Sequence, residues 1–94
     1  MYAVIRTYSG QGGSELFDLL EQREDEVKEI IGGVPGFVSY AAFRSGDGGA
    51  TVTICQEKAG TDESSRRAAD WVKQNVSTSV DPPAIAEGST ILHF

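Results

Sequence analysis

The sequence is poor in the residues that build covalent or metal-bound frameworks. It holds one cysteine, Cys55, and one histidine, His93, among 94 residues. A single cysteine excludes a disulfide within the chain and any zinc site built on several cysteines. No grouping of histidine, cysteine, aspartate and glutamate has metal-ligand spacing, so we expect no metal centre. Cys55 follows Ile54 in a strand-like segment, where we expect it to pack as a small side chain.

Basic residues and long apolar runs are scarce as well. Eight lysines and arginines stand against fourteen acids, which gives a net charge of −6. Arg66 and Arg67 form the one adjacent basic pair, so a phosphate-binding face is not expected and we expect no nucleic-acid partner. No segment approaches the roughly 18 apolar residues of a membrane span, and the N-terminus lacks a basic segment leading into an apolar one. We therefore expect a soluble, cytoplasmic protein with no membrane partner.

A glycine-rich hairpin is the clearest structural signal in the chain. Pro35 and Gly36 lead into the strand-like run 37–44, residues 45–49 are rich in glycine, and residues 50–56 return as a second strand-like run. Such a pattern predicts two antiparallel strands joined by a turn.

The remaining elements follow from periodicity and capping. Residues 1–8 predict a first strand, and Ser14 is placed to cap a helix over 14–31 that ends at Gly32 and Gly33. Seven of the fourteen acids lie between residues 15 and 29, which predicts a solvated acidic face on this helix.

A second helix is expected from Gly60 to residue 76, with a narrow apolar stripe of Ala68, Ala69, Val72 and Val76. Residues 77–88 read as a loop and residues 89–94 as a final strand. The order βαββαβ predicts one ferredoxin-like α+β domain over residues 1–94, in which two helices cover one face of a four-stranded antiparallel sheet.

The predicted strands carry apolar side chains on both faces. The first strand places Tyr2, Val4 and Tyr8 on one side and Ala3 and Ile5 on the other; the second places Val38, Tyr40 and Ala42 against Phe37, Ala41 and Phe43. Helices can cover only one face, so the other needs a second sheet. A homodimer built around a two-fold axis is the simplest way to supply it.

The segment from Ile31 to Tyr40, with Phe43 to Ser45 and the acidic first helix, resembles the dimeric α+β barrel superfamily, and within it the antibiotic-biosynthesis-monooxygenase-like domains. The resemblance covers nearly the whole chain, and its sharpest motif is the Pro-Gly turn into the second strand. It implies a barrel of two open sheets and a ligand bound between sheet and helices or inside the barrel. Members include cofactor-free oxygenases, haem degraders, isomerases and ligand sensors, so fold does not settle function.

The haem-degrading branch carries an asparagine on the first strand, a histidine on the second helix and a tryptophan on the third strand. This chain has Arg6 and Thr7 on the first strand, no histidine in residues 61–76, and its one tryptophan, Trp71, on the second helix. Haem chemistry is therefore not expected, and we expect no cofactor.

Polar and aromatic residues that can line a pocket are the remaining candidates. Arg6, within an apolar strand, predicts either a salt bridge, within the chain or across the dimer, or an anionic ligand. Tyr8 and Tyr40 offer hydroxyls to a ligand or packing to an interface, and Trp71 walls a cavity or fills the core. His93 titrates near neutrality and suits proton transfer, or has a structural role near the chain end.

Two functions are consistent with these candidates. One is binding of a small aromatic or anionic compound by Arg6, Tyr8, Tyr40, Trp71 and His93, with Arg44 as a further polar group and with cofactor-independent monooxygenase-like or isomerase-like chemistry. The alternative is a non-catalytic dimeric binding or stress-associated module. The turn at residues 10–14 lacks the lysine of a phosphate-binding loop and is expected to hold no ligand.

Overall fold

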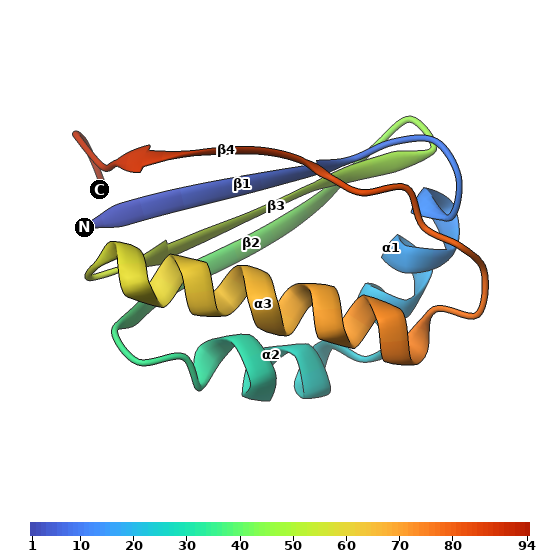
Figure 1. Cartoon of the computed structure of the whole chain (residues 1–94), viewed down its shortest axis with the longest axis horizontal. Coiled ribbons are helices and arrows are strands. Elements are labelled where there is room, and N and C mark those ends of the chain that lie inside the picture. Colours follow the sequence, from blue (N-terminus) through green and yellow to red (C-terminus); the bar gives the residue numbers. More distant parts are fainter.

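The computed structural model describes all 94 residues, Met1 to Phe94. One antiparallel sheet of four strands carries the helices on one of its faces, as Figure 1 shows. The elements follow the chain as β1 (Tyr2–Tyr8), α1 (Gly13–Gln22), α2 (Glu24–Gly32), β2 (Phe37–Ser45), β3 (Gly48–Cys55), α3 (Lys58–Asn75) and β4 (Ala84–Ser89). This arrangement confirms the ferredoxin-like α+β fold that the sequence predicts.

The sheet has the strand order β2-β3-β1-β4, with β1 and β3 in the middle. The predicted hairpin is β2 and β3, and its turn is tighter than expected: Ser45 pairs with Gly48, which leaves Gly46 and Asp47 between the strands. Gly46 has a φ of +60°, a backbone conformation that glycine adopts without steric cost.

An irregularity near the start of β2 corrects the predicted side-chain alternation. Phe37 pairs with Cys55 and Tyr40 pairs with Thr53, and the register shifts between Phe37 and Ser39. An inserted residue reverses the alternation of a strand, so Phe37 and Tyr40 both face the helices. The prediction that they lie on opposite faces is wrong for this reason.

The predicted helix over 14–31 is in fact two helices. The backbone leaves the helical region at Arg23, with φ −118° and ψ 39°, and α2 begins at Glu24. Three acids stand in the first turn of α2, where the positive end of the helix dipole favours them, so the acidic run starts a new helix there. The N-cap of α1 is Gly12 rather than the expected Ser14, which is exposed.

The second predicted helix is α3, which begins at Lys58. Three residues of the expected apolar stripe, Ala68, Val72 and Val76, pack in or against the core, whereas Ala69 is exposed. Trp71 is buried as well, together with the small residues Gly60, Thr61 and Ser64. These small residues let the helix approach the sheet: a Cβ added at Gly60 would lie 2.8 Å from the Cβ of Cys55. None of the helices combines the length and the apolar character that a bilayer crossing needs.

The last strand lies earlier in the chain than predicted. β4 spans Ala84–Ser89, inside the expected loop, and pairs antiparallel with β1 along its length. The amide of Thr90 donates to the carbonyl of Met1, next to the pair of Tyr2 with Ser89. Residues 91–94 form no strand, so the prediction of a strand over 89–94 is wrong.

The face of the sheet opposite the helices is uncovered within the chain, as Figure 1 shows. The register places the following side chains on it: Ala3 and Ile5 of β1, Ala41 and Phe43 of β2, Val52 and Ile54 of β3, and Ala84 and Ala86 of β4. Phe43 is 53% exposed. The expectation that both faces carry apolar side chains is confirmed.

Candidate functional site

Arg6 lies at the centre of the interface between the sheet and α3. Its side chain is only 2% exposed and bridges three elements. The guanidinium donates from Nη1 to the hydroxyls of Thr51 and Thr53 on β3, each at 3.2 Å. From Nε it donates to Ser65 at 3.1 Å and from Nη2 to Ser64 at 2.6 Å, both on α3. Arg6 therefore joins the two layers through neutral hydroxyl groups.

No carboxylate accompanies this buried cation. None of the ion pairs in the structure includes Arg6, so the salt bridge that was one of its two predicted partners does not form within the chain. Burial lowers the pKa of the Arg6 guanidinium, because a charge removed from water loses its hydration. The arginine nevertheless remains charged at neutral pH, since its ordinary pKa is far above 7.

A groove opens beside Arg6, between α3 and the chain that leads to β4. We call it the α3 groove; its volume is about 580 Å³. Its lining includes Arg6, Tyr8 and Ser65 on the floor, Ala69, Val72, Lys73 and Val76 from α3 or just beyond it, and residues 77–83 with Ile85 on the opposite wall. A largely apolar wall with a few convergent polar groups is typical of a small-molecule site.

The outer wall of the α3 groove is tied to the start of α1. Glu15 accepts hydrogen bonds from the amide of Ser77 at 2.9 Å and from the hydroxyls of Ser77 and Thr78. These hydrogen bonds, that of the Ser77 amide first, lower the pKa of Glu15. Asp81 accepts from the amide of Gln11 at 3.1 Å and donates its own amide to the Gln11 carbonyl at 3.0 Å. The glycine-rich turn thus fixes a wall of the groove.

Tyr8, Tyr40 and Trp71 meet at a small cavity deeper in the same layer. Its volume is about 30 Å³, room for about two waters. Burial raises the pKa of both tyrosine hydroxyls, so both stay neutral donors at physiological pH. The indole N–H of Trp71 donates to Glu26 of α2. Tyr8 lines both this cavity and the α3 groove, and so connects them.

A second and larger groove lies on the other side of the helical layer. We call it the β2 groove; it runs between β2 and the α1–α2 pair and has a volume of about 1010 Å³. Arg44 stands at its rim, where Nη2 and Nε donate to Asp18 and Glu21 of α1 at 2.7 and 2.8 Å. The Arg44 side chain is 41% exposed. This arginine bridges a strand and a helix at the surface.

The other candidates lie apart from these sites. His93 is on the exposed segment after β4 and lines neither groove. Cys55 is fully buried on β3, and burial raises the pKa of its thiol, so it is an unreactive packing residue as expected. The structure therefore brings Arg6, Tyr8, Tyr40 and Trp71 into one region and leaves His93 outside it.

Sequence reasoning missed the hydroxyls that hold Arg6. Thr51 and Thr53 alternate on the helix-facing side of β3, and Ser64 and Ser65 sit where α3 crosses β1. The sequence did contain a signal: threonines at every second position of one strand, and an arginine in another, apolar strand. Without the register of the sheet, it was not apparent that both threonines accept hydrogen bonds from this arginine.

No protein-family model and no curated protein sequence matches the chain. Solved structures match its fold over almost its full length. A Streptomyces coelicolor monooxygenase from the gene ActVA-Orf6, in complex with nanaomycin D, has a TM-score of 0.66 and 21% identity over 99% of this chain and 89% of that one. The heme-degrader MhuD of Mycobacterium tuberculosis, with two hemes in its active site, has a TM-score of 0.67 and 15% identity over 100% and 99%.

A dimeric ferredoxin-like protein from an uncultured marine organism has a TM-score of 0.65 and 10% identity over 99% of this chain and 94% of that one. Identities at this level establish a common architecture and leave ligand and activity open. The chain has the ferredoxin-like α+β fold of these monooxygenase-like proteins.

Proposed function

We propose that the protein binds a small molecule with an apolar, partly aromatic body in the α3 groove. The observation that carries this proposal is the groove itself, which opens onto a buried arginine and a buried tyrosine, Arg6 and Tyr8. Its volume of about 580 Å³ lies within the usual range for small-molecule sites. The neighbours solved with nanaomycin D and with two hemes support ligand binding by this fold.

The activity that we propose for the groove is monooxygenase-like and independent of a cofactor. Such chemistry begins when an electron-rich ring loses a proton, and a positive charge held near the ring stabilises the anion that forms. Arg6 is the group of this chain placed to do so. A non-catalytic binding module is the second candidate, and one observation favours it: His93, the one histidine of the chain, does not line the groove.

Binding and turnover are tested with separate probes. Isothermal titration with the neutral ring compound 1-naphthamide is expected to show binding to the native chain and loss of binding to Ala69→Phe, which fills the α3 groove. Ala59→Phe is the matched control, because Ala59 is also exposed on α3 but does not line the groove. Equal binding by all three chains, or binding by none, contradicts the proposed site.

Turnover is then measured as oxygen uptake with 1,4-dihydroxynaphthalene. A monooxygenase-like activity is expected to raise uptake above the spontaneous rate, and Ala69→Phe is expected to abolish that rise. Uptake at the spontaneous rate by a chain that binds 1-naphthamide supports the non-catalytic module instead.

We also propose that the chain forms a homodimer through the uncovered face of the sheet. That face is apolar around Ile5, Val52 and Phe43, and Phe43 is largely exposed. Exposed apolar area of this kind marks an interface in most soluble proteins. One structural neighbour is a dimeric ferredoxin-like protein.

Light scattering at micromolar concentration tests the homodimer. We expect a dimer mass for the native chain and a monomer mass for Val52→Glu, which places a charge at the centre of the face. Gln74→Glu, a charge added at an exposed position on α3, is the control and should stay dimeric. A monomer mass for the native chain contradicts this proposal.

A further inference from the structure

We propose that Arg6 is an anion receptor, and that the ligand of the α3 groove carries an oxyanion, a carboxylate or an enolate or phenolate, on its apolar body. This inference rests on the proposed function and names the class of ligand that the groove selects.

The guanidinium has one donor to spare. An arginine carries five N–H groups, and four of them are accounted for here. Thr51 and Thr53 take both protons of Nη1, Ser65 takes that of Nε, and Ser64 takes one of the two on Nη2. The second proton of Nη2 has no acceptor in the chain. Because Arg6 lines the α3 groove, a ligand atom in the groove is the available acceptor.

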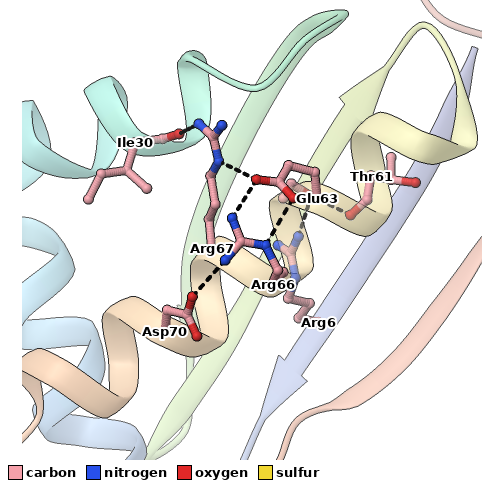
Figure 2. A network of polar contacts seen from close by, with 8 residues as sticks. Arg6, Ile30, Thr61, Glu63, Arg66, Arg67 and Asp70 are labelled. Carbon is pink, nitrogen blue, oxygen red and sulfur yellow. Dashed lines mark hydrogen bonds and ion pairs between the residues drawn. The ribbon is translucent and has the colours of Figure 1, made fainter.

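The charge of Arg6 is also uncompensated. Hydroxyl groups orient a guanidinium but carry no negative charge, and a buried cation without a partner is costly to a folded protein. Figure 2 shows Arg6 reaching from β1 to α3. It takes no part in the surface ion pairs that Glu63 makes with Arg66 and Arg67. The protein has fourteen acids, yet its most buried cation has no acidic partner. An anionic ligand would supply the missing negative charge.

The rest of the groove lining fits a ligand of that charge. Lys73 stands on its rim and makes no ion pair, so it adds a second positive charge. Asp81, the acid of the lining, is held by the amide of Gln11. Burial keeps the hydroxyl of Tyr8 protonated, so it can donate to the same oxyanion from the next helix-facing position of β1.

The apolar side chains of the groove form the complement to this charged floor. Val72, Val76, Val80 and Ile85 line the groove together with small polar residues such as Ser77 and Thr78. A ligand that places its oxyanion on Arg6 has room for a ring system against these four side chains. The geometry therefore selects a ring compound with an acidic group at one end rather than a free inorganic anion.

Calorimetric titration with matched probes tests the proposal. We expect the native chain to bind 1-naphthoate about tenfold or more tightly than 1-naphthamide, because a charge-assisted hydrogen bond replaces a neutral one. The enolate of 2-hydroxy-1,4-naphthoquinone compared with neutral 1,4-naphthoquinone separates the two kinds of oxyanion; the pair with the larger ratio identifies which of them the groove prefers.

Arg6→Met is expected to abolish the preference for the anion while 1-naphthamide still binds, and thermal melting establishes that the variant is folded. Arg6→Lys keeps the positive charge but lacks the planar fork of donors, and it is expected to retain part of the preference for the anion. This variant replaces Arg6→Met in the test if Arg6→Met does not fold. Equal affinity for charged and neutral probes in the native chain, or an unchanged preference in both variants, overturns the receptor. The proposed binding site survives that result, because it is tested separately, by the binding of 1-naphthamide and the loss of that binding in Ala69→Phe.

Discussion

Two arginines on strands of the same sheet lie in opposite surroundings. Arg44, at the end of β2, is 41% exposed and lies between two carboxylates, those of Asp18 and Glu21. Arg6, in the middle of β1, is 2% exposed and lies among four hydroxyls. The pKa of Arg44 is raised by its hydrogen bonds to Glu21 and Asp18, whereas burial lowers that of Arg6.

We propose that this difference separates a structural cation from one that is available to a ligand. The surface arginine is paired although water would hydrate it in any case, so its pairing adds little free energy. The buried arginine is unpaired where pairing would matter most. A position with high electrostatic cost and no partner within the chain is typical of functional sites, where binding supplies what the fold leaves open.

The largest effect on stability is expected at the hydroxyls that hold Arg6. Ser64→Ala removes the acceptor of the 2.6 Å bond from Nη2 and should lower the free energy of unfolding by about 1–3 kcal/mol, because a buried charged donor loses its partner. Arg44→Met, at the exposed pair, should lower it by a smaller amount, because water hydrates both partners of an exposed ion pair. Urea denaturation measures both, and a larger loss for Arg44→Met would reverse the comparison.

A double substitution sharpens the same contrast. In the background of Arg6→Met, Ser64→Ala should cost only a few tenths of a kcal/mol, so that the two changes show a coupling of about 1 kcal/mol or more. Arg6→Met alone should leave the chain as stable as the native protein or make it more stable, since an apolar side chain needs no hydration. Additive losses in the cycle would mean that Ser64 stabilises α3 without Arg6.

Salt is expected to change the stability cost of Arg44→Met but not that of Ser64→Ala, and this effect is smaller. Sodium chloride at about 1 M shortens the screening length to about 3 Å, so the cost of Arg44→Met should fall toward zero. The cost of Ser64→Ala should not change, because salt does not reach the buried guanidinium of Arg6. Unfolding free energies measured in low and high salt test this, and the expectation fails if both costs fall together.

The smallest effect on stability is expected at the surface ion pairs that Glu63 makes with Arg66 and Arg67. Arg66 and then Arg67 donate to Glu63 on the surface of α3 (Figure 2), and these bonds lower the pKa of Glu63 from 4.5 to about 2. A lowered pKa means that the contribution to stability is complete above pH 4.5 and is lost as the pH falls toward 2. Melting temperatures of the native chain and Glu63→Gln should therefore converge below pH 4.5. A constant difference down to pH 2 would contradict this assignment.

The sequence predicted the layer architecture because periodicity and turn chemistry are local. The hairpin from Phe37 to Cys55 carried glycine at its turn, and the structure has this turn; the predicted alternation of β2 holds only beyond the register shift between Phe37 and Ser39. The helix break at Arg23 and the true position of β4 depend on what each segment packs against. No local signal distinguishes residues 84–89 from residues 89–94 as the partner of β1.

The candidate site was predicted only in its charged and aromatic members. Arg6 stood out because an arginine within an apolar strand needs an explanation. Its partners did not, because Thr53 and Ser64 are ordinary residues until the register and the close approach of α3 bring them together. His93 was selected for its chemistry alone, and the structure places it on an exposed segment.

The central claim, that Arg6 holds a free donor for a ligand anion, is tested most directly by nitrogen-15 NMR of the arginine side chains. The guanidinium signals of Arg6 are identified as those that vanish in Arg6→Lys, and those of Arg44 as those that vanish in Arg44→Lys. Addition of 1-naphthoate should shift the Nη2 protons of Arg6 downfield and leave the Arg44 signals in place, while 1-naphthamide should leave both in place. A shift at Arg44 without one at Arg6 would contradict the account.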